Sequence, residues 1–271
     1  MSNTAIKIFI GTSDSQDKII EQVYLFSLFK NTDAELDITF MRPKKMGWTR
    51  NNWGTPFTSF RYAVPELCNF KGRAIYTDVD MINFRDIKDL WETDLEGKPM
   101  ASAWDFLCDN TVNRDDGWWA DSVLLFDCEK MKDFVDPIDE MKNWEGNYKK
   151  HWMQIHANSP DVEWAKKNLY HTLDSRWNSY DGQVTDYKEL PQGHFNKDYF
   201  WIKDNQNVSK RPQRPKDDIW QLHMTGLSTQ PWHPRYTSWG YSTHPRQDLM
   251  EIYWDYVKKV KMMEKPNYDL R

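Results

Sequence analysis

The sequence has 271 residues, of which 15% are aromatic, and its formal net charge at pH 7 is -5. This length allows one large or two small domains with a substantial core, and the aromatic content excludes a disordered chain. The acidic balance disfavours a general nucleic-acid-binding protein. Three cysteines without a CxxC pair disfavour a disulfide framework or a cysteine zinc site. No apolar run approaches the roughly 20 residues of a membrane-spanning helix.

A strand and a helix are predicted at the start of the chain. Residues 1–15 lack the basic and apolar blocks of a secretory signal, so we expect a cytoplasmic protein. An apolar run over residues 6–10 stops at Gly11-Thr12-Ser13-Asp14, which predicts a buried strand that ends in a loop. Ser13 and Gln16 have capping-box spacing, and apolar residues then recur at helical intervals over residues 20–28.

Strand and helix signals continue to alternate along the rest of the chain. Residues 36–40 alternate between apolar and polar, which predicts a strand, and residues 42–54 read as a loop. Thr55-Pro56 has the N-cap and first-turn signature of a helix that would carry Phe57, Phe60 and Val64. Further strands are predicted over residues 73–77, 100–104, 122–126 and 219–224, with helices around 162–173 and over 247–263.

This alternation predicts an α/β fold with a largely parallel sheet. The sequence shows no convincing linker, so we expect a single catalytic domain over residues 1–245, followed by a C-terminal amphipathic helix and tail over 246–271. Lys258, Lys259 and Lys261 make that helix basic. It could therefore lie on an anionic membrane surface, or it could cover the core of its own domain.

The sharpest local signal is an apolar strand, residues 74–77, that ends in Asp78-Val79-Asp80. In open α/β sheets, ligands bind beyond the carboxyl ends of the strands, so these carboxylates stand where a site is expected. Two hard oxygen ligands separated by one residue suit Mg²⁺ or Mn²⁺, which can in turn bridge phosphate oxygens. The alternative is a solvated pair of aspartates in a turn.

Segments on both sides of this motif carry a resemblance to a known family. Ser59-Phe60-Arg61-Tyr62 lies upstream of it, and residues 80–91 continue from it to Leu90-Trp91. Far along the chain, residues 223–232 run from His223 through Gly226 and Gln230 to Pro231-Trp232, which resembles the motif HxxGxxKPW. In this order, the segments resemble the nucleotide-sugar glycosyltransferases of the GT-A fold, and specifically glycosyltransferase family 8.

The resemblance implies a GT-A fold, in which a mostly parallel central sheet is flanked by helices, and a metal-dependent sugar transfer. The donor would be a nucleotide-diphosphate sugar, with a UDP-sugar as the first expectation, and the configuration at the sugar would be retained. Asp78, Asp80 and His223 would bind Mn²⁺ or Mg²⁺, with Val79 between the two acids. Gly226 would allow the backbone to approach the donor diphosphate closely.

Other positions are implied to contact the donor or acceptor. Gly11, Thr12 and Asp14 align with the segment that receives the nucleotide base and ribose, although Asp14 could equally cap a helix. Gln230 and Trp232 belong to the closing motif. Gln230 replaces the usual Lys, so either another base such as Arg235 substitutes or donor handling differs. The catalytic candidates are Arg61 beside the diphosphate or sugar, Asp105 near a sugar, and Asp121, which stands where the family has Asn in Asn-Ser-Gly-Val.

Two other functions stay open at this point. A phosphatase of the haloacid-dehalogenase type also uses DxD at a strand end, although Ile82 stands where that class has Thr or Val. A non-catalytic carbohydrate-binding protein would use tryptophans of loop-like segments to stack on sugars, whereas ordinary core packing is the other fate of those residues. The acceptor could be a glycan or another hydroxyl compound. A nucleic acid is conceivable because of basic clusters at residues 42–50 and 210–216.

Overall fold

A mixed α/β architecture is built around one large sheet. The computed structural model describes residues 5–16, 18–48, 55–105, 118–143, 161–180, 216–224, 230–232 and 247–263. The main sheet has six strands in the order β2-β1-β3-β6-β5-β7, and five of them run in the same direction, because only β6 pairs antiparallel with its neighbours. Its strands are β1 (Ile6–Gly11), β2 (Leu36–Met41), β3 (Arg73–Asp78), β5 (Met100–Asp105), β6 (Trp118–Asp127) and β7 (Tyr170–Leu173).

A second sheet has three short strands, two of which come from the later part of the sequence, residues 179–223. It has the order β4-β9-β8, with β4 at Met81–Asn83, β8 at Ser179–Tyr180 and β9 at Gln221–His223. β4 follows β3 after two residues, so the second sheet begins where the central strand of the main sheet ends. The central strand β9 pairs antiparallel with β4 and parallel with β8.

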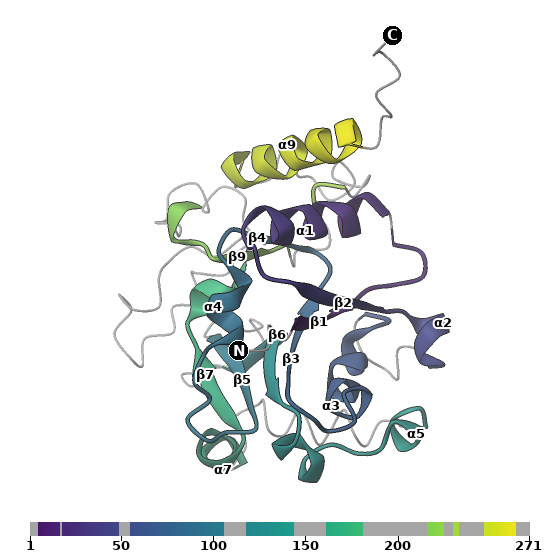
Figure 1. Cartoon of the computed structure of the whole chain (residues 1–271), viewed down its shortest axis with the longest axis vertical. Coiled ribbons are helices and arrows are strands. Elements are labelled where there is room, and N and C mark those ends of the chain that lie inside the picture. The colour runs from purple at the N-terminus through teal and green to yellow at the C-terminus, as the bar shows by residue number, and fades with distance from the viewer. Residues whose placement is uncertain are drawn as a thin grey trace, which may run out of the picture.

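Helices cover both faces of the main sheet (Figure 1). Alternate residues of each strand face opposite sides, so Ile8 and Ile75 pack in one hydrophobic cluster with α1 and α4, whereas Phe9 and Tyr76 pack in another. The α-helices are α1 (Lys18–Lys30), α2 (Pro43–Met46), α3 (Val64–Leu67), α4 (Ile87–Trp91), α5 (Ile138–Met141), α7 (Asp161–Asn168) and α9 (Gln247–Met263), and the 3₁₀ helices are η1 (Thr58–Ala63), η2 (Lys130–Asp133), η3 (Ser175–Asn178) and η5 (Lys216–Asp218).

Helix α9 lies beside α1 and covers a third cluster (Figure 1). Its buried residues Leu249 and Tyr253 share that cluster with Val23 of α1 and with Leu222 and Met224 in and after β9. The apolar face of α9 therefore covers the core of its own domain, which was one of the two predictions for this helix. The division of the chain at residues 245 and 246 stays a prediction.

The predicted α/β class and the largely parallel sheet are confirmed, and several local predictions need correction. The segment 42–54, predicted as a loop, includes helix α2, which has Pro43 in its first turn and ends at Gly47 with φ of 82°. The helix predicted from Thr55 is a 3₁₀ helix followed by α3, because Pro65 has no N–H with which to continue a longer helix. Ser13 does not begin a helix, since α1 starts only at Lys18.

The segment around 162–173 is only half helical. Helix α7 ends at Asn168, and Tyr170–Leu173 forms β7 at the edge of the main sheet, parallel to β5. Pairing with β5 decides this conformation, since strand formation depends more on neighbours than on local preference. Among the described residues, none of the helices combines the length and apolar character needed to cross a membrane.

Candidate active site

The site lies where the two sheets meet. Asp78 is the last residue of β3, Asp80 immediately precedes β4, and His223 is the last residue of β9. β4 and β9 pair with Met81 opposite His223, and the Met224 amide donates a hydrogen bond to the Asp80 carbonyl at 2.9 Å. Backbone pairing therefore brings together residues that are more than 140 positions apart in the sequence.

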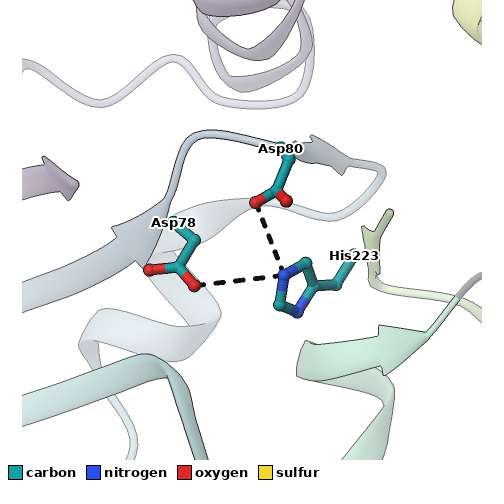
Figure 2. Close-up of side chains that lie close together, drawn as sticks. All are labelled: Asp78, Asp80 and His223. Carbon is teal, nitrogen blue, oxygen red and sulfur yellow. Dashed lines mark ion pairs between the residues drawn. The ribbon is translucent and has the colours of Figure 1, made fainter. Parts of the chain in front are cut away.

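The three side chains point toward one another (Figure 2). His223 Nε2 lies 3.4 Å from Asp80 Oδ1 and 4.0 Å from Asp78 Oδ2. One ligand atom from each residue falls within 4.8 Å of the others, a geometry that can hold a metal ion. The structure thus brings together the three residues predicted as metal ligands.

Asp78 is held by two donors, Tyr76 and Arg61, and Arg61 Nη2 also lies 3.4 Å from Oδ2, the oxygen nearer to His223. The Tyr76 hydroxyl donates to Asp78 Oδ1 at 2.7 Å, and Arg61 Nη2 lies 3.1 Å from the same oxygen. Burial raises the pKa of Asp78 above its usual value, although Arg61 acts in the opposite direction. Burial acts to lower the pKa of Arg61, but Asp78 together with Tyr76, Tyr62 and Asp121 outweighs it, so the pKa of Arg61 lies above its usual value.

Asp80 is held by Gln230, a residue of the predicted motif at residues 223–232. Gln230 Nε2 donates to Asp80 Oδ2 at 2.9 Å and to the Met224 carbonyl at 2.8 Å. Asp80 Oδ1 is buried and has no hydrogen-bond partner among the described residues, and it faces His223. A buried carboxylate oxygen without a partner is costly, so this atom fits the role of a ligand to a cation.

The chemistry of the cluster fits a divalent cation. The two carboxylates repel each other; Asp78 is buried and Asp80 is half-buried, and among the described residues the Arg61 guanidinium is the one that contacts them, through Asp78. Carboxylate oxygens suit Mg²⁺ and Mn²⁺, and an imidazole nitrogen is also accepted by Mn²⁺ and similar ions. Asp78, Asp80 and His223 could therefore hold one such ion.

The opening loop is placed mainly by its own packing. A side-chain carbon on Gly11 would collide with the Tyr76 hydroxyl and lie 2.9 Å from the Phe57 ring, which accounts for glycine at the end of β1. Thr12 is buried and donates to Glu21 at 3.0 Å, and the exposed Asp14 carboxylate accepts from the Lys44 amide at 3.1 Å. Asp14 therefore does not cap α1, and its predicted contact with a nucleotide stays a prediction.

The remaining predicted residues fall in three groups. Asp121 is buried on β6, where its Oδ2 accepts from the Tyr62 hydroxyl at 3.1 Å and from the Tyr170 hydroxyl at 3.0 Å. The side chains of Val79 and Trp232 pack into the hydrophobic clusters, Trp232 against Tyr253 at 5.2 Å between ring centroids. Gly226, Arg235 and the side chain of Asp105 lie outside the described residues, although the Asp105 backbone ends β5.

Several residues of the site were not predicted. Tyr76 lies two positions before Asp78 on the same strand, where period-two alternation alone could have indicated it. His223 Nδ1 lies 3.0 Å from Asn178 Oδ1, and no sequence pattern indicates that contact, because Asn178 lies in a weakly patterned part of the chain. Among the tryptophans of loop-like segments, Trp48, Trp119 and Trp177 are buried in the core.

Comparisons with known proteins give similarity at the level of structure. No protein family model and no curated protein matches the sequence. The galactosyltransferase LgtC, solved in complex with donor and acceptor sugar analogs, is similar with a TM-score of 0.56 and 16% identity over 94% of this chain and 96% of that chain.

Two further glycosyltransferases share this fold. GlyE from Streptococcus pneumoniae TIGR4 has a TM-score of 0.55 and 17% identity, over 94% of this chain and 60% of its own. The bifunctional glycosyltransferase WbbM has a TM-score of 0.53 and 14% identity, over 96% of this chain and 51% of its own. The chain therefore has the GT-A-like fold of these glycosyltransferases, as its resemblance to family 8 implied.

Proposed function

We propose that this protein is a metal-dependent glycosyltransferase that moves a sugar from a nucleotide-diphosphate donor to an acceptor hydroxyl. The observation that carries the proposal is the meeting of Asp78, Asp80 and His223, with ligand atoms within 4.8 Å of one another, at the carboxyl end of β3. That position is where open α/β sheets bind their ligands. The fold of glycosyltransferases supports the same assignment.

The chain's own residues would bind and orient the donor. Asp78, Asp80 and His223 would hold Mn²⁺ or Mg²⁺, with Val79 as the backbone link between the two acids. A divalent cation bound there supplies Lewis-acid stabilisation of the negative charge that builds up on the departing diphosphate. Arg61 holds Asp78 in place through the ion pair at 3.1 Å, and its buried Nε, which has no partner among the described residues, is a donor suited to a diphosphate oxygen.

The finer assignments extend this proposal. Gly11, Thr12 and Asp14 would receive the nucleotide, Gly226 and Trp232 would border the diphosphate, and Asp105 and Asp121 would stand near the transferred sugar. UDP is the proposed nucleotide and retention the proposed outcome, both on the resemblance to family 8. A glycan or another hydroxyl compound is the proposed acceptor, and LgtC was solved with donor and acceptor sugar analogs. No observation supports a nucleic-acid acceptor, which stays a prediction from the sequence, as does the cytoplasmic location.

The phosphatase alternative loses support. Its first aspartate would have to act as a nucleophile, but Asp78 Oδ1 accepts from Tyr76 and lies beside Arg61. The fold is also that of glycosyltransferases. A carbohydrate-binding protein without catalysis would leave the cluster of Asp78, Asp80 and His223 unexplained.

Thermal unfolding with a panel of nucleoside diphosphates, with and without Mn²⁺, tests the proposal. We expect UDP to raise the melting temperature only when Mn²⁺ is present, since the ion links the diphosphate to the two aspartates. Asp80→Asn should abolish that shift and the hydrolysis of UDP-sugars, whereas Asp139→Asn, a change at an exposed ion pair with Lys142, should alter neither. Wild-type turnover in excess chelator, or no response to any nucleoside diphosphate, would contradict the proposal.

A further inference from the structure

Asn178 connects the candidate metal site to the main sheet. It is the last residue of η3, directly before β8, and only 4% of its surface is exposed. Its Nδ2 donates to the Ala120 carbonyl of β6 at 3.0 Å, and its Oδ1 lies 3.0 Å from His223 Nδ1. Both polar atoms of the Asn178 amide therefore have a hydrogen-bond partner.

These two contacts determine which nitrogen of His223 carries the proton. A backbone carbonyl can only accept, so the Asn178 NH₂ group must face Ala120 and the amide oxygen must face the imidazole. An amide oxygen can also only accept, so His223 Nδ1 must be the donor. The neutral imidazole then presents the lone pair of Nε2 toward Asp80 Oδ1 and Asp78 Oδ2.

The opposite tautomer would make the cluster a poor binding site for a cation. With its proton on Nε2, His223 could donate to Asp80 Oδ1, which lies 3.4 Å away and has no other partner among the described residues. That contact would satisfy both groups and remove two of the three ligand atoms. A residue that holds the proton on Nδ1 keeps those atoms available for a cation.

The contacts of His223 with its neighbouring strands fix its place and not its proton. β4 and β8 pair with β9 on both sides, with Met81 and Tyr180 opposite His223. The Tyr180 ring meets the imidazole edge-on at 5.4 Å between centroids. Loss of the Asn178 amide would therefore leave the ring in place while removing the acceptor that Asn178 offers to Nδ1–H.

We propose that Asn178 is a positioning residue that holds His223 in the Nδ1–H tautomer and so directs Nε2 to the metal. This inference rests on the metal site of the proposed function. It assigns to a residue of η3, outside the predicted motifs, a role in setting the affinity for the ion.

Two variants and a control separate this role from simple packing. Asn178→Ala removes both hydrogen bonds. Asn178→Asp keeps an acceptor for Nδ1–H but loses the donor to Ala120. It should therefore keep the tautomer of wild type and be less stable than wild type. Asn31→Ala is the matched control, because Asn31 Nδ2 also donates to backbone carbonyls, those of Ser27 and Asn83 at 2.8 and 2.9 Å, away from the site.

The readouts are the histidine tautomer in metal-free protein at pH 8, by ¹H–¹⁵N NMR, and the Mn²⁺ dissociation constant. We expect His223 to be Nδ1–H in wild type, Asn178→Asp and Asn31→Ala, and to lose that preference in Asn178→Ala. The Mn²⁺ affinity of Asn178→Ala should fall about 10-fold or more, whereas Asn178→Asp should recover most of it despite its lower melting temperature.

The outcomes distinguish this inference from the proposed function. If wild type binds Mn²⁺ and Asn178→Ala retains both the tautomer and the affinity, Asn178 has no positioning role and the glycosyltransferase assignment stands. The same conclusion follows if affinity in the two variants simply tracks melting temperature. If wild type binds no Mn²⁺, the metal site of the proposed function fails, and this inference fails with it.

Discussion

Each side chain of the Asp78, Asp80 and His223 cluster has one polar atom that faces the cluster and a second atom that contacts a neighbour, and for Asp78 the Arg61 guanidinium contacts both oxygens. This arrangement fixes where each ligand atom points before any ion arrives, which reduces the reorganisation that binding would need. The neighbours are Tyr76 and Arg61 for Asp78, Gln230 for Asp80, and Asn178 for His223.

Gln230 shows how one residue of the cluster can be changed without losing its geometry. Gln230→Lys can donate to the same acceptors, Asp80 Oδ2 and the Met224 carbonyl, but adds a positive charge. We expect a higher melting temperature without metal, because the ammonium offsets the Asp80 charge. The affinity for Mn²⁺ should fall about 10-fold, roughly 1.4 kcal/mol, because two cations then share one carboxylate.

Calorimetric titration with Mn²⁺ and thermal unfolding in chelator measure these two effects. Gln230→Ala is the control, since it removes both hydrogen bonds without adding charge and should lower affinity and melting temperature together. Tighter Mn²⁺ binding by Gln230→Lys than by wild type would contradict this expectation.

Gly11 affects the cluster through Tyr76. Gly11→Ala would place a methyl group against the Tyr76 hydroxyl, which holds Asp78 Oδ1. We expect a loss of stability of about 1–3 kcal/mol from overpacking, together with weaker Mn²⁺ binding. Gly97→Ala is the control, because its φ of 81° makes the change unfavourable although no atom lies within 4 Å. Denaturant unfolding and Mn²⁺ titration should show a stability loss in both variants and weaker Mn²⁺ binding only in Gly11→Ala, so wild-type affinity in Gly11→Ala would contradict this account.

At the scale of elements, the short strand β9 links the site to α9. Leu222 and Met224 flank His223 and, by the alternation of a strand, face the opposite side, where they share a cluster with Leu249. Leu249→Ala should therefore cost about 2–5 kcal/mol and lower the melting temperature by more than about 5 °C. Well below that temperature, Mn²⁺ affinity should stay within about threefold of wild type, because the cavity lies on the far side of β9.

Thermal unfolding and Mn²⁺ titration of Leu249→Ala, beside the exposed Glu251→Ala on the same helix, check this expectation. A melting temperature unchanged from wild type would mean that α9 does not stabilise the second sheet.

The elements also show what the sequence could and could not predict. Strongly patterned segments such as β1, β3 and α9 were predicted within one or two residues. The strands β4 and β8 have three and two residues, too short for any period to appear, and they form because β9 lies between them. β7 was predicted as part of a helix because its conformation depends on pairing with β5, which no local pattern reveals.

At the scale of the whole molecule, the fold brings together two motifs from distant parts of the chain. The DxD motif and the histidine were predictable because each resembles a family motif in the right order. The contacts of Asn178 and Gln230 were not, because they depend on which side chains the fold places beside one another, whereas strand alternation could have indicated the contact of Tyr76 with Asp78. The similarity to LgtC, at 16% identity, supports the fold and leaves the chemistry to be tested at these residues.

The most direct test is a crystal structure of the protein with Mn²⁺ and UDP, with anomalous diffraction data that locate manganese. The account predicts a single manganese peak that is coordinated by Asp78, Asp80 and His223 Nε2 and that contacts the diphosphate. A manganese peak at another position, or a nucleotide bound away from the carboxyl end of β3, would contradict it.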